Sequence, residues 1–163
     1  MYVSEALHSG HNFQSFDCGK KPLNDWIKNS ALSTERQRTS RTFVLCEDSG
    51  EVIAYYSLAA HAVSPEGLPN RIRGNTRGGI PAVLLAKLAL HRDHHGRGLG
   101  GALLADALGR VVEASKHVGT RIVVVDAIDD EAAAFYEKHG FQPMPGTPRL
   151  VRRVSSIAAD LET

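Results

Sequence analysis

Four glycines stand close together past the middle of the chain, at Gly96, Gly98, Gly100 and Gly101. Glycine has no Cβ, so the backbone at these positions can approach a ligand closely. The following segment has helical spacing, and the free N–H groups and positive dipole end of a helix start favour an anion. The pattern therefore predicts a phosphate site, and the alternative is a tight strand–helix turn without a ligand.

The spacing of these glycines excludes two common nucleotide motifs. A Rossmann fingerprint needs Gly-x-Gly-x-x-Gly early in a βαβ unit and an acidic residue about 20 residues later. Here the glycines are spaced by two and follow a long stretch of other structure. No Gly-Lys-Ser or Gly-Lys-Thr occurs, so a Walker loop is also excluded.

Histidines beside the glycines raise the question of a metal site, at His91, His94 and His95. We expect no metal, because these histidines have neither a fourth ligand nor a cysteine pair near them. The two cysteines of the chain, Cys18 and Cys46, also lack metal spacing and indicate a reduced, cytoplasmic protein.

The segments around the glycines are predicted to form both strands and helices. Strands are predicted at 42–46, 52–62, 84–90 and 121–127, with 52–62 central and 121–127 buried and parallel. Helices are predicted from Pro22, from the end of the glycine run, and from Asp129 or Asp130 to Gly140. The helix after the glycines carries an apolar stripe at Leu104, Leu108, Val111 and Val118.

The remaining segments are predicted to be less regular. Residues 1–16 are weakly patterned, and glycines and prolines make 64–81 a loop. Residues 141–154 should form a closing hairpin or irregular strands, and 155–163 a polar tail.

Bulk composition predicts one globular domain. The chain has 163 residues, of which 42% are hydrophobic and 23% charged, with a net charge of +1. That length leaves room for a core. No apolar run approaches the roughly 20 residues of a membrane helix. The start of the chain, 1–5, lacks the pattern of a secretory signal.

Positive charge is concentrated in two segments of this nearly neutral chain. The stretch 20–41 carries six basic residues against two acidic ones, and the loop 64–81 carries three arginines against one acid. A solvated surface is the alternative to a binding site for such charge. A long loop in a compact domain is more often functional than idle.

Two motifs together resemble the GNAT N-acetyltransferases. The loop 95–100, His-Gly-Arg-Gly-Leu-Gly, is similar to the family's Arg/Gln-x-x-Gly-x-Gly/Ala loop, with His95 in place of Arg or Gln. The segment 132–141, Ala-Ala-Ala-Phe-Tyr-Glu-Lys-His-Gly-Phe, is similar to a second landmark of the family. The resemblance implies a single α/β (α+β) domain over 1–163 with the GNAT fold. This fold is a mixed central β-sheet flanked by helices, with splayed parallel central strands.

The resemblance also implies acetyl-coenzyme A as co-substrate. The amides of the loop would hold its pyrophosphate, and the backbone of 88–90 would pair with the pantetheine arm and polarise the thioester carbonyl. Asp129 stands where the family commonly has an Asn that contacts the coenzyme. The implied cofactor-binding residues are Leu88, Ala89, Leu90, His95, Gly96, Arg97, Gly98, Leu99, Gly100, Gly101 and Asp129.

Tyr136 would be the general acid that protonates the leaving thiolate. An ordinary tyrosine pKa of about 10 is above a thiol pKa of about 8.5, so Tyr136 would serve mainly as a hydrogen-bond donor. The alternative is a core aromatic whose hydroxyl is bonded to backbone. Glu137, Asp126 and the histidines are candidates for the general base, but the sequence gives them no geometry and no clear base is evident. The lack of a base matches an α-amine of pKa about 7.8 better than a lysine of about 10.4.

Segments in the N-terminal half resemble the GNAT toxins of bacterial toxin–antitoxin pairs. They are 16–19, 23–27, 40–44, 54–58 and 80–89, the last with Lys87 where Arg is frequent. This resemblance implies acetylation of the α-amine on charged tRNA and arrest of translation. It also implies a homodimer and a ribbon-helix-helix antitoxin through which alone the protein meets operator DNA. Contacts to aminoacyl-tRNA are expected at Arg36, Arg38, Arg41, Arg73, Arg77 and Arg92.

Two other functions remain open from the sequence. One is acetylation of a small-molecule amine or a peptide amine, which would be indifferent to salt. The other is a binding module without catalysis, which would bind the coenzyme without turnover. Neither reading involves a membrane.

Overall fold

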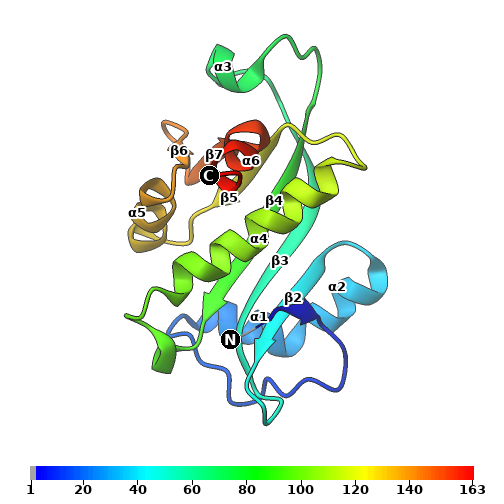
Figure 1. The fold of residues 1–163 in the computed structure, drawn as a ribbon, viewed down its shortest axis with the longest axis vertical. Helices are drawn as coiled ribbons and strands as arrows, with labels where there is room; N and C mark the ends of the chain where they lie inside the picture. Colours follow the sequence, from blue (N-terminus) through cyan, green and yellow to red (C-terminus); the bar gives the residue numbers. More distant parts are fainter. Residues whose placement is uncertain (1–2) are drawn as a thin grey trace. The chain divides into compact units, whose positions relative to one another are not determined.

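A computed structural model describes residues 3–163. Met1 and Tyr2, part of the segment 1–5 that was predicted to lack a secretory signal, lie outside the described residues. Figure 1 shows the elements in chain order. They are β1 (Glu5–Ala6), α1 (Lys21–Asn29), α2 (Ala31–Gln37), β2 (Arg41–Cys46), β3 (Val52–Val63), α3 (Asn70–Arg73), β4 (Ile80–Leu90), the 3-10 turn η1 (Arg92–His94), α4 (Leu99–Ser115), β5 (Ile122–Asp126), α5 (Asp130–Lys138), β6 (Gln142–Pro143), β7 (Arg149–Arg153) and α6 (Val154–Leu161).

The strands form a mixed sheet in the order β1-β2-β3-β4-β5-β7-β6, as the α/β prediction required. The pairs β1–β2, β2–β3, β5–β7 and β6–β7 are antiparallel, whereas β4–β5 is parallel. The parallel register joins 82–84 to 122–124 and ends there, although β4 continues to Leu90 and β5 to Asp126. Pairing thus stops before both strands end, which fits central strands that diverge.

The described chain divides into two compact units. Unit 1 comprises the residues up to Ala59 together with Ala86–Ala107, and unit 2 comprises Ala60–Leu85 together with Leu108–Thr163. The strands β3 and β4 and the helix α4 pass from one unit into the other. The single domain over 1–163 stays a prediction.

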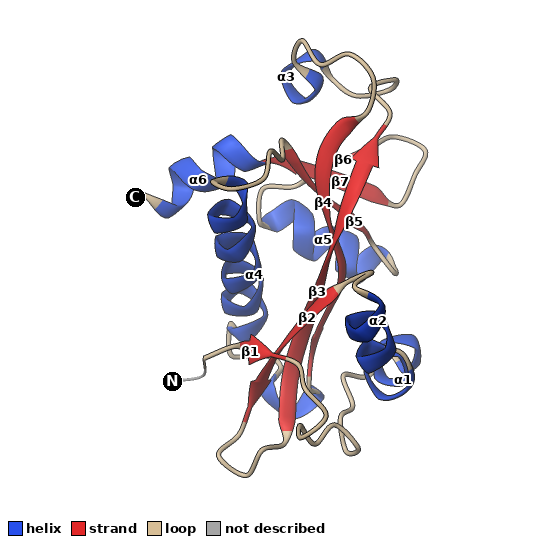
Figure 2. Cartoon of the chain, turned by 90° about the vertical axis from the view of Figure 1, so that its right-hand side faces the viewer, coloured by secondary structure: helices blue, strands red, loops and turns tan. Residues whose placement is uncertain are grey.

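Unit 1 is built on β1, β2 and the first part of β3. Within it, α1 and α2 cover one face of the strands and the first turns of α4 cover the other (Figure 2). Pro22 fits the start of α1, and Trp26 and Ile27 follow at the spacing of its apolar face. Ile27 packs in a core with Phe16 and Tyr55. The weakly patterned segment 1–16 therefore contributes core residues that periodicity did not reveal.

Unit 2 packs around β5 and β7. Its core contains Ile72, Ile80 and Val124, so the predicted loop 64–81 is partly structural. The short helix α3 lies in this loop, and the Arg121 side chain anchors it by donating from Nε to the Ile72 carbonyl at 2.7 Å. The predicted strands 42–46, 52–62 and 121–127 are confirmed within two residues at each end.

The loop prediction for 64–81 is wrong where α3 forms and where β4 begins at Ile80, and two further local predictions are wrong. Most of the expected polar tail 155–163 instead belongs to helix α6, because Val154 and Ile157 are spaced to bury one face and are 6% and 1% exposed. Val118 was assigned to the buried stripe of α4, but α4 ends at Ser115 and Val118 is 71% exposed. No helix among residues 3–163 is long and apolar enough to cross a membrane.

Candidate active site

The glycine run forms the turn between β4 and α4 in unit 1. Gly96 and Gly98 have φ of +79° and +75°, a left-handed conformation that other residues adopt only with strain. An added Cβ at either position would meet no atom within 4 Å, so the turn is open rather than packed. Gly100 and Gly101 already belong to α4. The backbone angles therefore require glycine twice, and the open turn ahead of a helix start suits a phosphate.

Side chains brace this turn from within unit 1. His95 donates from Nε2 to the Leu90 carbonyl at 2.7 Å. The Arg92 amide donates to the Asp17 carbonyl at 2.9 Å, and its guanidinium lies 3.4 Å from the Asp17 carboxylate. The bond from the Gly19 amide, with smaller help from Asn24 and Arg92, holds the pKa of Asp17 below its usual value. His95 and Arg92, predicted to bind coenzyme and RNA, thus also fix the shape of the turn.

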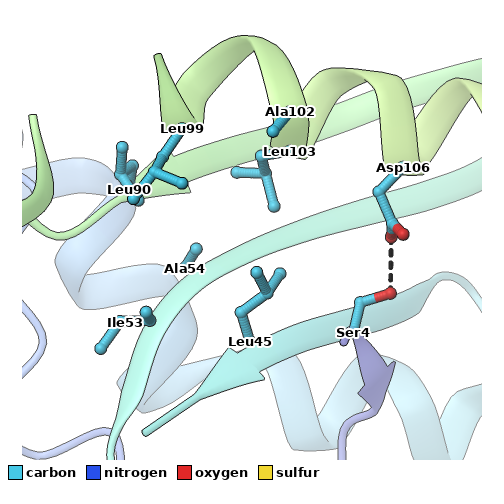
Figure 3. A pocket seen from close by; sticks show the side chains of 9 residues that line it. All are labelled: Ser4, Leu45, Ile53, Ala54, Leu90, Leu99, Ala102, Leu103 and Asp106. Atoms are coloured by element: carbon cyan, nitrogen blue, oxygen red, sulfur yellow. Dashed lines mark hydrogen bonds between the residues drawn. The ribbon is translucent and has the colours of Figure 1, made fainter. Parts of the chain in front are cut away.

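A cavity of about 250 Å³ opens beside the same turn. Figure 3 shows Leu90 and Leu99 at one end and Asp106 at the other. Asp106 accepts hydrogen bonds from the Ser4 hydroxyl at 2.5 Å and the Tyr56 hydroxyl at 2.6 Å. Asp106 was not among the predicted site residues, although an acidic residue on the same helix face as Leu99 and Leu103 indicates a polar group at an apolar surface.

Tyr136 lies on α5 in unit 2. The Asp129 side chain caps this helix by accepting from the Ala132 amide at 2.8 Å, and Gly140 follows its end with φ +91°. The predicted caps are confirmed.

The Tyr136 ring packs between Phe135 and Phe141 and is 7% exposed. Burial raises the pKa of Tyr136 well above its usual value. Its hydroxyl makes no hydrogen bond with any described residue. The hydroxyl oxygen is also not fully buried, since the fully buried polar atoms without a partner are those of other residues. The backbone bond expected of a purely structural tyrosine is absent from the described part of the chain. The hydroxyl is therefore available to a ligand, as a donor rather than as an acid.

Three charged or polar residues form a network across the strands of unit 2. Arg149 on β7 donates from Nε and Nη2 to the two Asp126 oxygens, each at 2.9 Å. Its Nη1 lies 3.2 Å from His61 Nε2. An arginine donates only, so Nε2 of His61 accepts and Nδ1 carries the proton. The Arg149 bond also holds the pKa of Asp126 below its usual value.

This network bears on the choice of a general base. Asp126 and His61 are both hydrogen-bonded to Arg149, so neither offers a free general base. Arg149 could not be predicted as part of this site, because it meets Asp126 through strand pairing and His61 only in the folded chain.

The arginines predicted to contact RNA fall into two states. Arg41 pairs with Glu35 at 2.7 Å, Arg73 is bonded to Asn70, and Arg92 faces Asp17. Arg36, Arg38 and Arg77 have no acidic partner among residues 3–163. The first two lie in unit 1 and Arg77 in unit 2. Three of the six predicted arginines are therefore free to meet phosphates.

One group of potential metal ligands occurs among residues 3–163. The ligand atoms of Glu5, His8 and His11 lie within 4.8 Å of one another. Nδ1 of His11 accepts from the His8 amide and Nδ1 of His8 from the Gly10 amide, both at 3.0 Å. Their protons must therefore sit on Nε2, where His11 contacts Glu5 at 2.7 Å. A metal at Nε2 would need the other tautomer.

Comparison with known proteins extends the resemblance to most of the chain. Residues 38–143 match the acetyltransferase (GNAT) domain family. A tRNA-acetylating toxin of Mycobacterium tuberculosis is 42% identical over 134 residues, covering 82% of this chain and 80% of that protein. The solved structure of AtaT complexed with acetyl-methionyl-tRNAfMet has a TM-score of 0.91 and 29% identity over 100% of both chains. A tyrosine-to-phenylalanine mutant of AtaT, bound to the C-terminus of the antitoxin AtaR and acetyl-CoA, has a TM-score of 0.87 and 28% identity over 99% of both chains.

Proposed function

Because the chain belongs to the acetyltransferase (GNAT) family, we propose that it acetylates the α-amine of the amino acid on charged tRNA and so blocks translation. The observation that carries this proposal is the extent of the likeness. A tRNA-acetylating toxin and AtaT with its acetylated tRNA each match most or all of this chain. The free arginines Arg36, Arg38 and Arg77 add a means of holding an RNA backbone.

The cofactor end of the reaction belongs to unit 1. Acetyl-CoA supplies the acetyl group as a thioester. The amides of the turn 96–101 bind its pyrophosphate, and the backbone of Leu88, Ala89 and Leu90 aligns the pantetheine arm. His95 acts through its bond to the Leu90 carbonyl, which fixes the turn against β4.

Tyr136, which belongs to unit 2, is the residue proposed to act on the leaving group. The Tyr136 hydroxyl donates a hydrogen bond to the coenzyme sulfur, and this bond strengthens as the sulfur becomes anionic. The raised pKa of Tyr136 keeps its proton in place over the physiological range. The acceptor is an α-amine, which is neutral in roughly a tenth of molecules at pH 7 and needs no residue as base.

The proposed partners follow from the same reading. They are aminoacyl-tRNA, a ribbon-helix-helix antitoxin that neutralises the enzyme, a second copy of the chain in a homodimer, and operator DNA through the antitoxin only. These substrates place the activity in the cytoplasm.

A cell-free translation reaction with labelled acetyl-CoA tests the function. Wild type should move label into the RNA-linked fraction and arrest translation, and Tyr136→Phe should do neither. Normal translation without label in RNA would overturn the proposal. Turnover of free polyamines or peptides under the same conditions would then identify a small-molecule or peptide amine as acceptor.

A further inference from the structure

Lys87 on β4 is a half-buried lysine with no acidic partner among residues 3–163. Its Nζ lies 5.3 Å from the centre of the Trp26 ring on α1 and 3.3 Å from the Ala86 carbonyl. Desolvation lowers the pKa of Lys87 below its usual value. This desolvation favours the neutral, nucleophilic amine over the ammonium form.

Two other lysines of the chain are exposed and paired with carboxylates. Lys21 pairs with Asp25 at 2.5 Å and is 85% exposed. Lys116 pairs with Glu113 at 2.9 Å and is 63% exposed, and this partner raises the pKa of Lys116. Both amines are thereby kept charged and in solvent.

The position of Lys87 in the strand also matters. It directly precedes Leu88, the first of the backbone groups proposed to align the pantetheine arm. An extended lysine side chain carries its amine roughly 6 Å from its own Cα, so a thioester aligned on the backbone of the next residues would lie within this range. Strand β4 and the glycine turn both belong to unit 1 over this stretch. The step rests on the acetyl-CoA binding of the proposed function.

We propose that Lys87 is a self-acetylation site, modified when acetyl-CoA is bound and no charged tRNA is present. The neutral ε-amine attacks the thioester carbonyl carbon, a C–N bond forms and the C–S bond breaks. The amine loses one proton, and the departing coenzyme A takes up one proton to leave as the thiol. No other reactant is needed. The product is an amide, which removes the positive charge and the cation–π contact with Trp26.

Peptide mass mapping of the full chain after incubation with labelled acetyl-CoA, without RNA, tests this site. Lys87 should carry most of the label, ahead of Lys116 and Lys21, because desolvation favours its neutral amine while the other two amines are paired with carboxylates. Lys87→Arg keeps the charge and should remove the main labelled peptide, whereas the matched control Lys116→Arg should not.

The outcomes separate this inference from the proposed function when charged tRNA is assayed in parallel. Equal labelling of all lysines, or none at Lys87, overturns the inference even if tRNA is acetylated. Label at Lys87 with unlabelled tRNA supports the inference and counts against the proposed acceptor. Equal rates in folded and urea-denatured protein would show that the fold does not direct the reaction, and would also overturn it.

Discussion

The two units of the chain hold candidate functional groups of different kinds. In unit 1 the turn 96–101 is defined by backbone, with two glycines at positive φ and bracing bonds from His95 and Arg92. In unit 2 the candidate functional groups are side chains, namely the unbonded Tyr136 hydroxyl and the Asp126–Arg149–His61 network. We therefore expect the function of unit 1 to depend on backbone conformation and the function of unit 2 to depend on single side-chain atoms.

The largest effect is expected from a substitution that removes one oxygen atom from unit 2. Tyr136→Phe should lower the rate of acetyl transfer to charged tRNA by roughly 100-fold or more, the scale of losing one preorganised donor. Its thermal stability should stay close to wild type, because the hydroxyl has no partner among the described residues. Quenched single-turnover assays and a melting curve check both parts. A tyrosine needed only for packing would retain transfer as phenylalanine.

The next largest effect, on acetyl-CoA affinity, is expected from a substitution that strains the backbone of unit 1. Gly98→Val places a β-branched residue at φ +75°, at a cost of roughly 1–2 kcal/mol. We expect about 10-fold weaker acetyl-CoA binding by calorimetry. Gly119→Ala is the matched control, because Gly119 lies outside the turn and does not have positive φ. Equal affinities of Gly98→Val and wild type would show that the turn does not hold the coenzyme.

A smaller effect is expected at the free arginines. Arg36→Gln and Arg38→Gln in unit 1 should each weaken charged-tRNA binding a few-fold and reduce its salt dependence by about one ion. Arg41→Gln should do less, since Arg41 is already paired with Glu35. Filter binding over a salt series measures this. If the paired arginine matters as much as the free ones, the assignment of the contacts fails.

The smallest effect concerns stability in unit 2. Arg149→Gln should lower the free energy of unfolding at pH 7 by about 1 kcal/mol or less, because the partly exposed pair is screened. The pKa of Asp126 is depressed in the folded state, so this contribution is present above its ordinary value near 3.9 and lost as pH falls through the folded value. Urea unfolding at pH 7 and pH 3 should show the difference shrinking. Arg77→Gln, which breaks no pair, is the control.

The sequence predicted best what depends on local pattern. The glycine turn, the cap at Asp129 and the strands around β3 and β5 follow from neighbours in the chain. The helix α6 was missed because its apolar residues are few and its burial depends on the rest of unit 2. Val118 matched helical spacing but fell past the end of α4. Periodicity gives the face of a helix without giving where the helix ends.

The site was harder to predict where it depends on contacts between distant parts of the chain. His61 on β3 and Arg149 on β7 are far apart in sequence, and their side chains meet only in the folded chain. The sequence also could not tell free arginines from paired ones, since Glu35 and Asp17 reach their partners only in the folded chain. Tyr136 was identified by resemblance, and its unbonded hydroxyl is a property of the fold.

The measurement that tests the division between the units most directly is the acetyl-CoA affinity of Tyr136→Phe, by titration calorimetry. A backbone-defined site in unit 1 predicts a dissociation constant within about twofold of wild type, while transfer to charged tRNA is lost. A fall in affinity that matches the fall in transfer would contradict the account, because Tyr136 would then hold the coenzyme rather than assist its departure.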